Sequence, residues 1–140
     1  MKAEIVTHSP EETRALGRRV GAGLKKGDVL LLVGDLGSGK TTFAKGVAEA
    51  CGVDVTVRSP TFALMHKYRG DPDVLHVDLY RERDALGLED LDWEAEGREA
   101  VTLVEWPRGL TNDLWPDAPR VHLEHVDETS RRIHLPEDAV

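Results

Sequence analysis

The stretch from Gly34 to Thr41 has the residue types and the spacing of a loop that binds phosphate. It reads Gly-Asp-Leu-Gly-Ser-Gly-Lys-Thr, so four residues separate its first glycine from the glycine that precedes the lysine. We expect Gly34, Gly37 and Gly39 to take positive φ angles, which turns successive backbone N–H groups towards an anion. Lys40 adds a full positive charge for the β- and γ-phosphates, and Thr41 offers a hydroxyl to Mg²⁺. The stretch therefore predicts a site for nucleotide phosphates.

The segments on either side of this loop are typical of a strand that enters it and a helix that leaves it. Residues 29–33 form an uninterrupted apolar run, as in a strand buried on both faces of a sheet. After the loop, apolar residues recur at the spacing of one helix face: Phe43, Ala44, Val47, Ala48 and Cys51. A helix that begins at the loop would add its N-terminal dipole to the backbone donors. Strand, glycine-rich turn and helix in this order are the context that a phosphate-binding motif requires.

A site for a nucleoside triphosphate also needs carboxylates that hold Mg²⁺ and orient the attacking water. Two apolar runs supply candidates, because residues 74–80 contain Asp78 and residues 100–105 end at Glu105. Both acids would project at the carboxyl edge of a parallel sheet, where ligands bind. The run before Asp78 is interrupted by His76, which we interpret as a packing or hydrogen-bonding residue without a metal role. Either acid alone could be a solvated strand end, so the pattern leaves the choice between them open.

The rest of the chain alternates between strand and helix signals. Ser9, followed by Pro10 and two acids, marks the start of a helix that we expect over residues 10–25. Further strands are expected at 53–57 and 63–68, a helix at 83–91, a helical turn at 109–115, and an antiparallel hairpin at 121–135. This alternation predicts an α/β fold: a three-layer sandwich like that of the P-loop NTPases, with a mainly parallel central sheet and antiparallel edge strands.

Composition limits the classes of protein to which the chain can belong. Its 140 residues fit one domain, residues 1–140, with 40% hydrophobic residues. The net charge of −8 argues against a surface that grips nucleic acid by itself, because such surfaces are usually basic. The single cysteine, Cys51, excludes an internal disulfide and a cysteine-rich metal site. No apolar stretch is long enough to cross a membrane and no signal-peptide pattern opens the chain, so we expect a cytoplasmic protein.

Four blocks of residues, in this order and spacing, resemble one family. They are Gly-Asp-Leu-Gly-Ser-Gly-Lys-Thr-Thr at 34–42, Ser-Pro-Thr-Phe at 59–62, His-Val-Asp-Leu-Tyr-Arg at 76–81 and Glu-Trp at 105–106. In these blocks the chain is similar to the bacterial TsaE (YjeE) family, and the resemblance runs from Pro10 to about Arg131. A phosphate loop alone is shared by many families, whereas the four blocks together are specific. The resemblance implies a small ATPase required for making threonylcarbamoyladenosine next to the anticodon of tRNAs.

The resemblance also implies roles for particular residues. The phosphates of ATP would be held by Gly37, Ser38, Gly39, Lys40, Thr41 and Thr42. Mg²⁺ would be bound by Thr41 or Thr42 and by the acids Glu105 and Asp78. The expected catalytic residues are these two acids and Lys40. Residues 59–62 would be a switch-like segment that senses the γ-phosphate through Thr61. Trp106 would lie near the nucleotide, as would Thr13 and Arg131, although Arg132 competes with Arg131 for that alignment.

The partners implied by the resemblance are the TsaD and TsaB proteins, whose turnover the ATP cycle would support. Three other readings bear on this interpretation. A small GTPase would need an Asn-Lys-x-Asp motif, which the sequence lacks. A small-molecule kinase would need an acceptor pocket and an arginine-bearing lid, for which Arg81, Arg83 and Arg98 are candidates. A nucleotide-binding adaptor that does not hydrolyse ATP differs from an ATPase only through Glu105 and Asp78.

Overall fold

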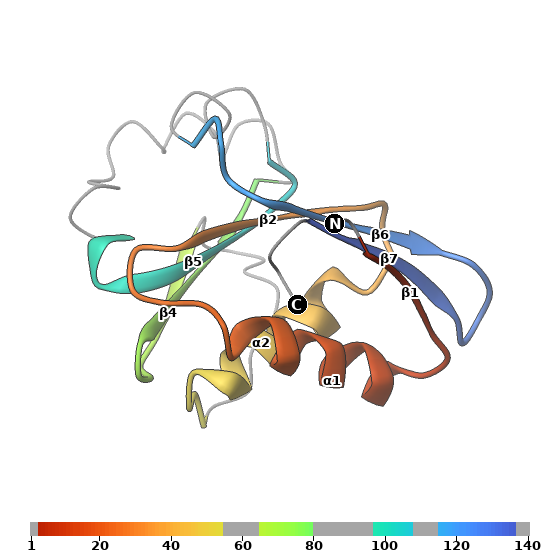
Figure 1. Ribbon diagram of the computed structural model, residues 1–140, viewed down its shortest axis with the longest axis horizontal. Coiled ribbons are helices and arrows are strands. Elements are labelled where there is room, and N and C mark those ends of the chain that lie inside the picture. Colours follow the sequence, from red (N-terminus) through yellow and green to blue (C-terminus); the bar gives the residue numbers. More distant parts are fainter. Residues whose placement is uncertain (1–2, 55–64, 80–96, 108–114, 137–140) are drawn as a thin grey trace.

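The structure is a computed structural model that describes residues 3–54, 65–79, 97–107 and 115–136, and the statements below concern these ranges. Within them, seven strands form one sheet in the order β1-β7-β6-β2-β5-β4-β3, and two helices lie on one of its faces (Figure 1). The elements are β1 (Ala3–Thr7), α1 (Pro10–Gly21), β2 (Val29–Val33), α2 (Lys40–Ala50), β3 (Met65–Tyr68), β4 (Asp73–Asp78), β5 (Ala100–Glu105), β6 (Arg120–His125) and β7 (Arg131–Leu135).

The sheet is mainly parallel, which confirms the predicted fold class. Strands β6, β2, β5 and β4 are neighbours that pair in parallel, while β7 and β3 pair antiparallel with the strands beside them. The predicted hairpin is formed by β6 and β7, but it does not make the edge. Strand β1, which the sequence analysis did not predict, pairs antiparallel with β7 and forms that edge. The opposite edge is β3, so antiparallel pairings lie towards both edges.

Helix α1 begins as the sequence predicts and ends earlier. The Ser9 side chain accepts a hydrogen bond from the backbone N–H of Glu12 at 3.1 Å, and Pro10 occupies the first turn. The helix ends at Gly21 instead of residue 25, and Leu24 lies beyond it, partly buried against the core. Leu16 and Val20 are buried on the inner face. The predicted amphipathic pattern is therefore confirmed for three helical turns.

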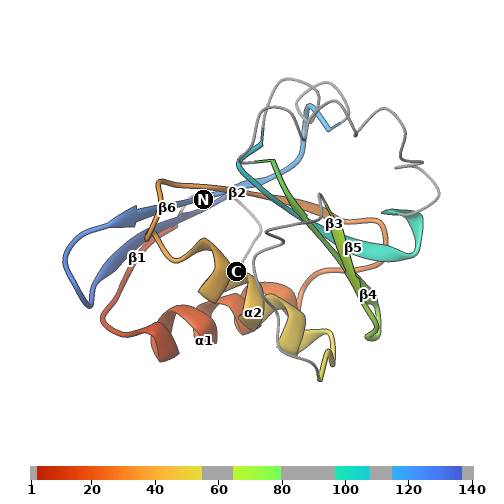
Figure 2. The ribbon, with the colours of Figure 1, turned by 180° about the vertical axis from the view of Figure 1, so that it is seen from behind.

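The two helices approach each other closely enough for backbone to touch backbone. A β-carbon added at Gly17 of α1 would lie 2.2 Å from the carbonyl oxygen of Phe43, and one added at Gly46 of α2 would lie 2.0 Å from the carbonyl oxygen of Arg14. Neither position has room for a side chain, so glycine is required by the packing. Figure 2 shows from behind that α1 and α2 lie side by side beneath the sheet. This contact fixes the position of α1 relative to the helix that leaves the phosphate loop.

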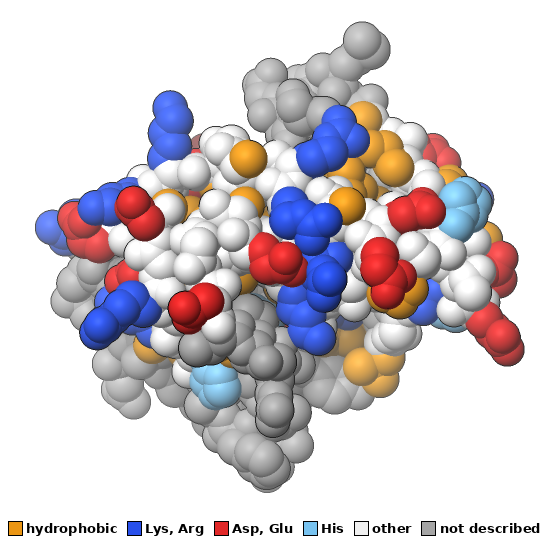
Figure 3. Space-filling view, turned by 90° about the horizontal axis from the view of Figure 1, so that it is seen from below, with side chains coloured by type: hydrophobic (Ala, Val, Ile, Leu, Met, Phe, Trp, Pro, Cys, Tyr) orange, Lys and Arg blue, Asp and Glu red, His pale blue; other side chains and the backbone are white. Residues whose placement is uncertain are grey.

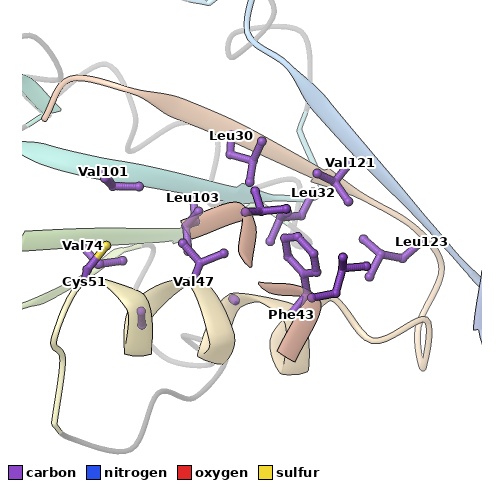
Figure 4. Close-up of a cluster of buried hydrophobic side chains, with 14 of the residues drawn as sticks. Leu30, Leu32, Phe43, Val47, Cys51, Val74, Val101, Leu103, Val121 and Leu123 are labelled. Carbon is purple, nitrogen blue, oxygen red and sulfur yellow. The ribbon is translucent and has the colours of Figure 1, made fainter. Parts of the chain in front are cut away.

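The core between helices and sheet consists of apolar side chains from both helices and most of the strands. Leu30 and Leu32 of β2, Phe43 of α2, Leu103 of β5 and Val121 of β6 point towards one another and are at most 1% exposed (Figure 4). Alternate residues of β2, β4 and β5 face the other way. Together with Leu79, which follows β4, they make a second cluster with the members Leu31, Leu75, Val77, Leu79, Ala100 and Val104. Both faces of the central strands are thus apolar, as the uninterrupted run at 29–33 predicts.

Some of the predicted elements fall outside the described ranges. The helix at 83–91 lies entirely outside them, and of the predicted turn at 109–115 only Trp115 is described. Helices α1 and α2 share one face of the sheet, so the third layer of the predicted sandwich is not among the described residues. Of the strand predicted at 53–57, the two described residues, Val53 and Asp54, are not in a strand. The strand predicted at 63–68 is confirmed from Met65 onwards as β3.

The face formed by the two helices mixes charges of both signs instead of presenting one basic field (Figure 3). Glu49 of α2 pairs there with two arginines of α1, Arg14 at 3.1 Å and Arg18 at 3.3 Å. These pairs are about half exposed, so each contributes at most about 1 kcal/mol to the free energy of unfolding. In the described part of the chain, no helix is long and apolar enough to cross a membrane.

Candidate functional site

The predicted phosphate loop connects β2 to α2 at the carboxyl end of β2. Gly37 and Gly39 have φ angles of 78° and 100°, in the left-handed region that favours glycine. Gly39 is also the N-cap of α2, so the free N–H groups of the first helical turn face the loop and are available to an anion. The expected backbone conformation is confirmed at these two glycines.

Gly34 differs from the expectation, because it is not among the glycines with positive φ. A β-carbon at this position would lie 2.5 Å from the carbonyl oxygen of Leu123 and 2.5 Å from the Ser38 hydroxyl oxygen. Gly34 is therefore required by lack of space rather than by backbone conformation. The Ser38 hydroxyl is buried and has no hydrogen-bond partner within the described residues, which leaves a polar atom inside the loop for a ligand to engage.

Lys40 is drawn into the loop instead of extending into solvent. Its ammonium group donates hydrogen bonds to the carbonyl oxygens of Gly34, at 2.5 Å, and Asp35, at 3.0 Å. It also lies 3.9 Å from the centre of the Trp106 ring, in a cation–π contact. Burial lowers the pKa of Lys40 below its ordinary value, while the nearby carboxylates of Glu105, Asp78 and Asp35 act in the opposite direction. A phosphate group would supply the negative charge that this buried cation favours.

The two candidate acids come together beside Lys40. Asp78 and Glu105 are partners in the parallel pairing of β4 with β5, and Glu105 is also the partner of Leu32 in β2. Glu105 is 2% exposed, and one of its carboxylate oxygens lies 3.5 Å from the Thr41 hydroxyl. Asp78 is half-buried and near enough to raise the pKa of Lys40. The sheet thus places both acids, the lysine and the threonine at the same end of the central strands.

A contact between His76 and Glu105 completes this group, and the sequence pattern does not predict it. His76 Nε2 lies 2.5 Å from the other Glu105 oxygen, Oε2, and both side chains are buried. The sequence analysis expected His76 to pack or hydrogen-bond, but it did not connect the residue with the site. A signal was available: strand alternation places His76 on the same face of β4 as Asp78. The partner itself could not be read from the sequence, because it depends on how β4 and β5 align.

Trp106 follows Glu105 and has an unusual backbone. Its φ angle is 58°, the only positive value at a residue other than glycine in the described ranges. This conformation is costly for a bulky residue and clusters at functional sites in proteins. It brings the indole ring against the Lys40 ammonium group. The structure therefore places Trp106 at the loop, where the resemblance implies a residue near the nucleotide.

Thr13 and Arg131 lie on the opposite flank of the loop. A β-carbon built on Gly39 would meet a Thr13 methyl group at 3.5 Å and the Arg131 side chain at 3.7 Å. The Thr13 hydroxyl hydrogen-bonds the hydroxyl of Thr7 at 2.6 Å, which ties α1 to β1 beside the loop. Arg132 points elsewhere, to Glu4 at 3.1 Å and Glu124 at 3.3 Å. Of the two competing arginines, the structure places Arg131 at the loop.

The turn that carries Arg131 is held by its own hydrogen bonds. The Arg131 guanidinium donates to the carbonyl oxygens of Asp127 at 2.7 Å and Ser130 at 2.8 Å. Backbone N–H groups of Thr129 and Ser130 donate to the Asp127 carboxylate and hold the pKa of Asp127 below its usual range. The side chain of Arg131 is thus directed by a turn that is already ordered.

The other predicted site residues are Thr42, at the start of α2, and Thr61, in the expected switch. Thr42 is half-buried in the first turn of α2. Thr61 and the rest of the expected switch at 59–62 lie outside the described residues. A cavity of about 630 Å³ lies at the other end of β2, between Leu24, Val29 and Trp115, and none of the predicted site residues lines it. The candidate chemistry is therefore concentrated at the phosphate-loop end of the sheet.

The residues present fit a magnesium ion and a nucleotide. Mg²⁺ prefers hard oxygen ligands and commonly combines one or two carboxylates with phosphate oxygens and water. The Thr41 hydroxyl and the carboxylates of Glu105 and Asp78 are such ligands. Within the described ranges, no three His, Cys, Asp or Glu side chains are grouped as a metal centre. A metal here would be bound jointly by these side chains and by phosphate oxygens of the nucleotide, as in the phosphate-loop proteins generally.

Fold and sequence together define the chain as an α/β protein with a glycine-rich loop between β2 and α2. The family model described as "Threonylcarbamoyl adenosine biosynthesis protein TsaE" matches residues 7–133. The chain therefore belongs to the TsaE family, as its four sequence blocks predict.

Individual relatives agree with this assignment. The tRNA threonylcarbamoyladenosine biosynthesis protein TsaE of Mycobacterium tuberculosis is 43% identical over 133 residues, which cover 88% of this chain and 79% of that protein. The protein of the same description from Bacillus subtilis is 39% identical over 131 residues, 91% of this chain and 80% of the relative. The crystal structure of Bacillus subtilis YdiB has a TM-score of 0.75 at 31% identity and covers 96% of this chain and 84% of its own.

Proposed function

We propose that this protein binds ATP with Mg²⁺ at the loop from Gly34 to Thr41 and hydrolyses it in support of tRNA threonylcarbamoyladenosine biosynthesis. The observation that carries the proposal is the meeting of four groups from three elements. Lys40 and Thr41 begin α2, Asp78 ends β4 and Glu105 ends β5, and the strand pairing brings all of them to the loop. A positive group, a hydroxyl and two carboxylates at one loop are what triphosphate hydrolysis requires.

Each residue has a role that follows from its chemistry. The backbone N–H groups of the loop and the Lys40 ammonium would bind the phosphates, with Lys40 exchanging its carbonyl partners for phosphate oxygens. The Thr41 hydroxyl and Glu105 would hold Mg²⁺, which neutralises phosphate charge when bound. Thr41 is favoured over Thr42 because its hydroxyl is the one that lies 3.5 Å from Glu105. Asp78 would share the metal or orient the attacking water.

The flanking residues would complete the nucleotide site. Trp106 would cover the phosphate side of the nucleotide, because its ring already stacks on the Lys40 ammonium. Thr13 and Arg131 would contact the nucleotide from the other flank, since both side chains lie against Gly39. The segment 59–62 is proposed as the switch on the basis of its sequence alone, in which Pro60 stiffens two hydroxyl residues. Docking of Thr61 on the γ-phosphate would then report the state of the nucleotide.

The biological setting is proposed from the relatives, which are described as tRNA threonylcarbamoyladenosine biosynthesis proteins. We infer that the ATP cycle acts on the TsaD and TsaB proteins in the cytoplasm and that the transfer reaction belongs to those partners. A net charge of −8 favours such a protein-directed role over direct binding of tRNA. The helix face, which carries charges of both signs, agrees with this inference.

The decisive experiment is an ATP hydrolysis assay with the purified chain, alone and with the TsaD and TsaB proteins, at several Mg²⁺ concentrations. Hydrolysis that requires Mg²⁺ and changes when the partners are added is the expected result. Tight ATP binding without hydrolysis under any of these conditions would establish the non-hydrolysing adaptor instead. Phosphate transfer to an added small molecule, in place of release into water, would establish a kinase.

A further inference from the structure

His76 occupies a position that a purely structural residue would fill at lower cost. It lies in the middle of β4, its side chain is 0% exposed, and it faces the helices together with Val74 and Asp78. Its ring nitrogen Nδ1 is buried and has no hydrogen-bond partner within the described residues. An unsatisfied buried polar atom destabilises the fold, whereas leucine would fill the site without that cost. The imidazole must therefore be needed for its other nitrogen.

That other nitrogen holds one particular oxygen of Glu105. His76 Nε2 lies 2.5 Å from Oε2, while Oε1 of the same carboxylate lies 3.5 Å from the Thr41 hydroxyl. The two oxygens thus face different partners from different elements, β4 on one side and α2 on the other. A free glutamate side chain has three rotatable bonds, and fixing them costs conformational entropy. A hydrogen bond from a buried, rigid ring keeps the carboxylate in one orientation before any ligand arrives.

The hydrogen-bond inventory also indicates which way the bond runs. A carboxylate that binds a metal ion must be ionised and can then only accept, so this role of Glu105 requires the proton of the hydrogen bond on His76 Nε2. In that tautomer Nδ1 is the acceptor nitrogen, and it is the buried atom that has no hydrogen-bond partner in the described residues. The arrangement is the one found around metal sites, where an outer residue orients a ligating carboxylate.

We infer that His76 is a positioning residue for Glu105: it donates from Nε2 to Oε2 and so presents Oε1 to Thr41 and the phosphate loop. The inference rests on the proposed ATPase function, because Oε1 is the atom that would face Mg²⁺. His76 itself touches neither nucleotide nor metal. Its effect on turnover passes through Glu105.

Kinetics of two substitutions and one control test this inference. His76→Leu removes the donor and keeps an apolar side chain, whereas His76→Gln keeps an amide N–H that can reach Oε2. The control is His66→Leu, because His66 is the cross-strand partner of His76 in β3 but contacts Tyr68 instead of Glu105. We expect His76→Leu to lower kcat for ATP hydrolysis about 10- to 100-fold. We expect KM and the calorimetric Kd for ATP to stay within about threefold, His76→Gln to recover most of kcat, and the control to match the unsubstituted protein.

A second measurement does not depend on activity. Long-range ¹H–¹⁵N correlation spectra of the ligand-free protein report which ring nitrogen of His76 carries the proton. We expect the proton on Nε2, and we expect the His76 nitrogen shifts to change in Glu105→Gln. A proton on Nδ1 with Nε2 unprotonated would overturn the inference, even if His76→Leu does not fold.

The outcomes separate this inference from the proposed function. An unsubstituted protein that neither binds nor hydrolyses ATP refutes the proposed function, while the spectra still report on the contact between His76 and Glu105. An active protein whose folded His76→Leu variant has normal kcat refutes only the positioning role. If both His76 variants showed similar decreases in kcat, ATP affinity and melting temperature, the residue would merely support the fold.

Discussion

The ends of β4 and β5 differ although they occupy equivalent positions in the sheet. Asp78 and Glu105 are paired residues, each the last of its strand, and each follows an apolar run. Glu105 is 2% exposed, its two oxygens face His76 and Thr41, and the next residue has a positive φ angle. Asp78 is only half-buried, and the backbone continues into Leu79, which donates to the carbonyl oxygen of Glu105. Equivalent strand ends can thus hold one fixed carboxylate and one that remains accessible to solvent.

This difference indicates a division of labour within the proposed ATPase site. A carboxylate that is fixed before the ligand arrives loses little entropy on binding and suits the transition state. A more accessible carboxylate can adjust to the nucleotide and to water. The predictions below test the difference between the two acids first and then extend the test to the residues around the loop.

Glu105→Gln should have the largest effect. The substitution keeps the size of the side chain and removes the charge, so kcat for ATP hydrolysis should fall about 100-fold or more while ATP binding is retained. Steady-state kinetics and titration calorimetry measure the two quantities. Glu99→Gln is the matched control, because Glu99 is 69% exposed and pairs only with Lys26 at 3.2 Å among the described residues. Near-normal turnover in Glu105→Gln would transfer the role to Asp78.

Lys40→Met should raise the Kd for ATP about 10- to 100-fold, because it removes a charged hydrogen bond worth about 1.5–3 kcal/mol. It should not lower the melting temperature at pH 7. Burial lowers the pKa of Lys40 in the folded state below its pKa in the unfolded chain. The protonated lysine therefore destabilises the fold fully at pH values below the folded-state pKa. This destabilisation disappears as the pH rises from the folded-state pKa to the unfolded-state pKa.

Calorimetry and thermal unfolding of Lys40→Met give the two readouts. Lys45→Met, on the same helix, is the control with the same change of charge. Unchanged ATP affinity in the folded Lys40 variant would remove the basis for assigning the phosphate loop.

Alanine at the two acids should separate them by stability. In Glu105→Ala the buried His76 donor loses its acceptor, so the free energy of unfolding should fall by about 1–3 kcal/mol. Asp78→Ala should cost less, because the half-buried side chain leaves water able to replace its contacts. Chemical denaturation of the ligand-free proteins gives both values. A larger loss in Asp78→Ala would reverse the ranking of the two strand ends.

The smallest effect is expected on the other flank of the loop. Arg131→Ala should weaken ATP binding about fivefold, the loss of about 1 kcal/mol, because its side chain lies against Gly39. Arg132→Ala makes the same change of charge one residue away, where the side chain pairs with Glu4 and Glu124, and should leave ATP affinity unchanged. Calorimetry of the two variants under identical salt is the test. If Arg132→Ala had the larger effect, the assignment of the arginine would be wrong.

Local sequence patterns predicted the parts of this molecule that depend on neighbouring residues. The apolar run before Gly34 and the helical spacing after it gave the strand, loop and helix, because each pattern is complete within about ten residues. The acids Asp78 and Glu105 could be placed at one sheet edge because parallel strands end together. Strand β1 was missed, since five residues before a helix start carry little signal, and its pairing with β7 is a tertiary feature.

The site details that escaped prediction all depend on alignment between distant segments. The contact of His76 with Glu105 joins residues 29 positions apart and exists only because β4 and β5 pair in one register. The choice between Arg131 and Arg132 depends on the register of β7, in which a shift of one residue would exchange the two faces. The need for glycine at position 34 comes from Ser38 in the same loop and also from Leu123 in β6, and the second contact could not be found from any local pattern.

The backbone contact between α1 and α2 has a consequence for engineering this protein. Rules of helix propensity recommend replacing glycine by alanine inside a helix, for a gain of about 1 kcal/mol at each position. At Gly17 and Gly46 that advice would fail, because the new methyl group would collide with a carbonyl oxygen of the facing helix. The collision would force the helices apart and carry Thr13 away from Gly39. A thermostabilised variant should therefore keep both glycines and be sought on the exposed side of α1.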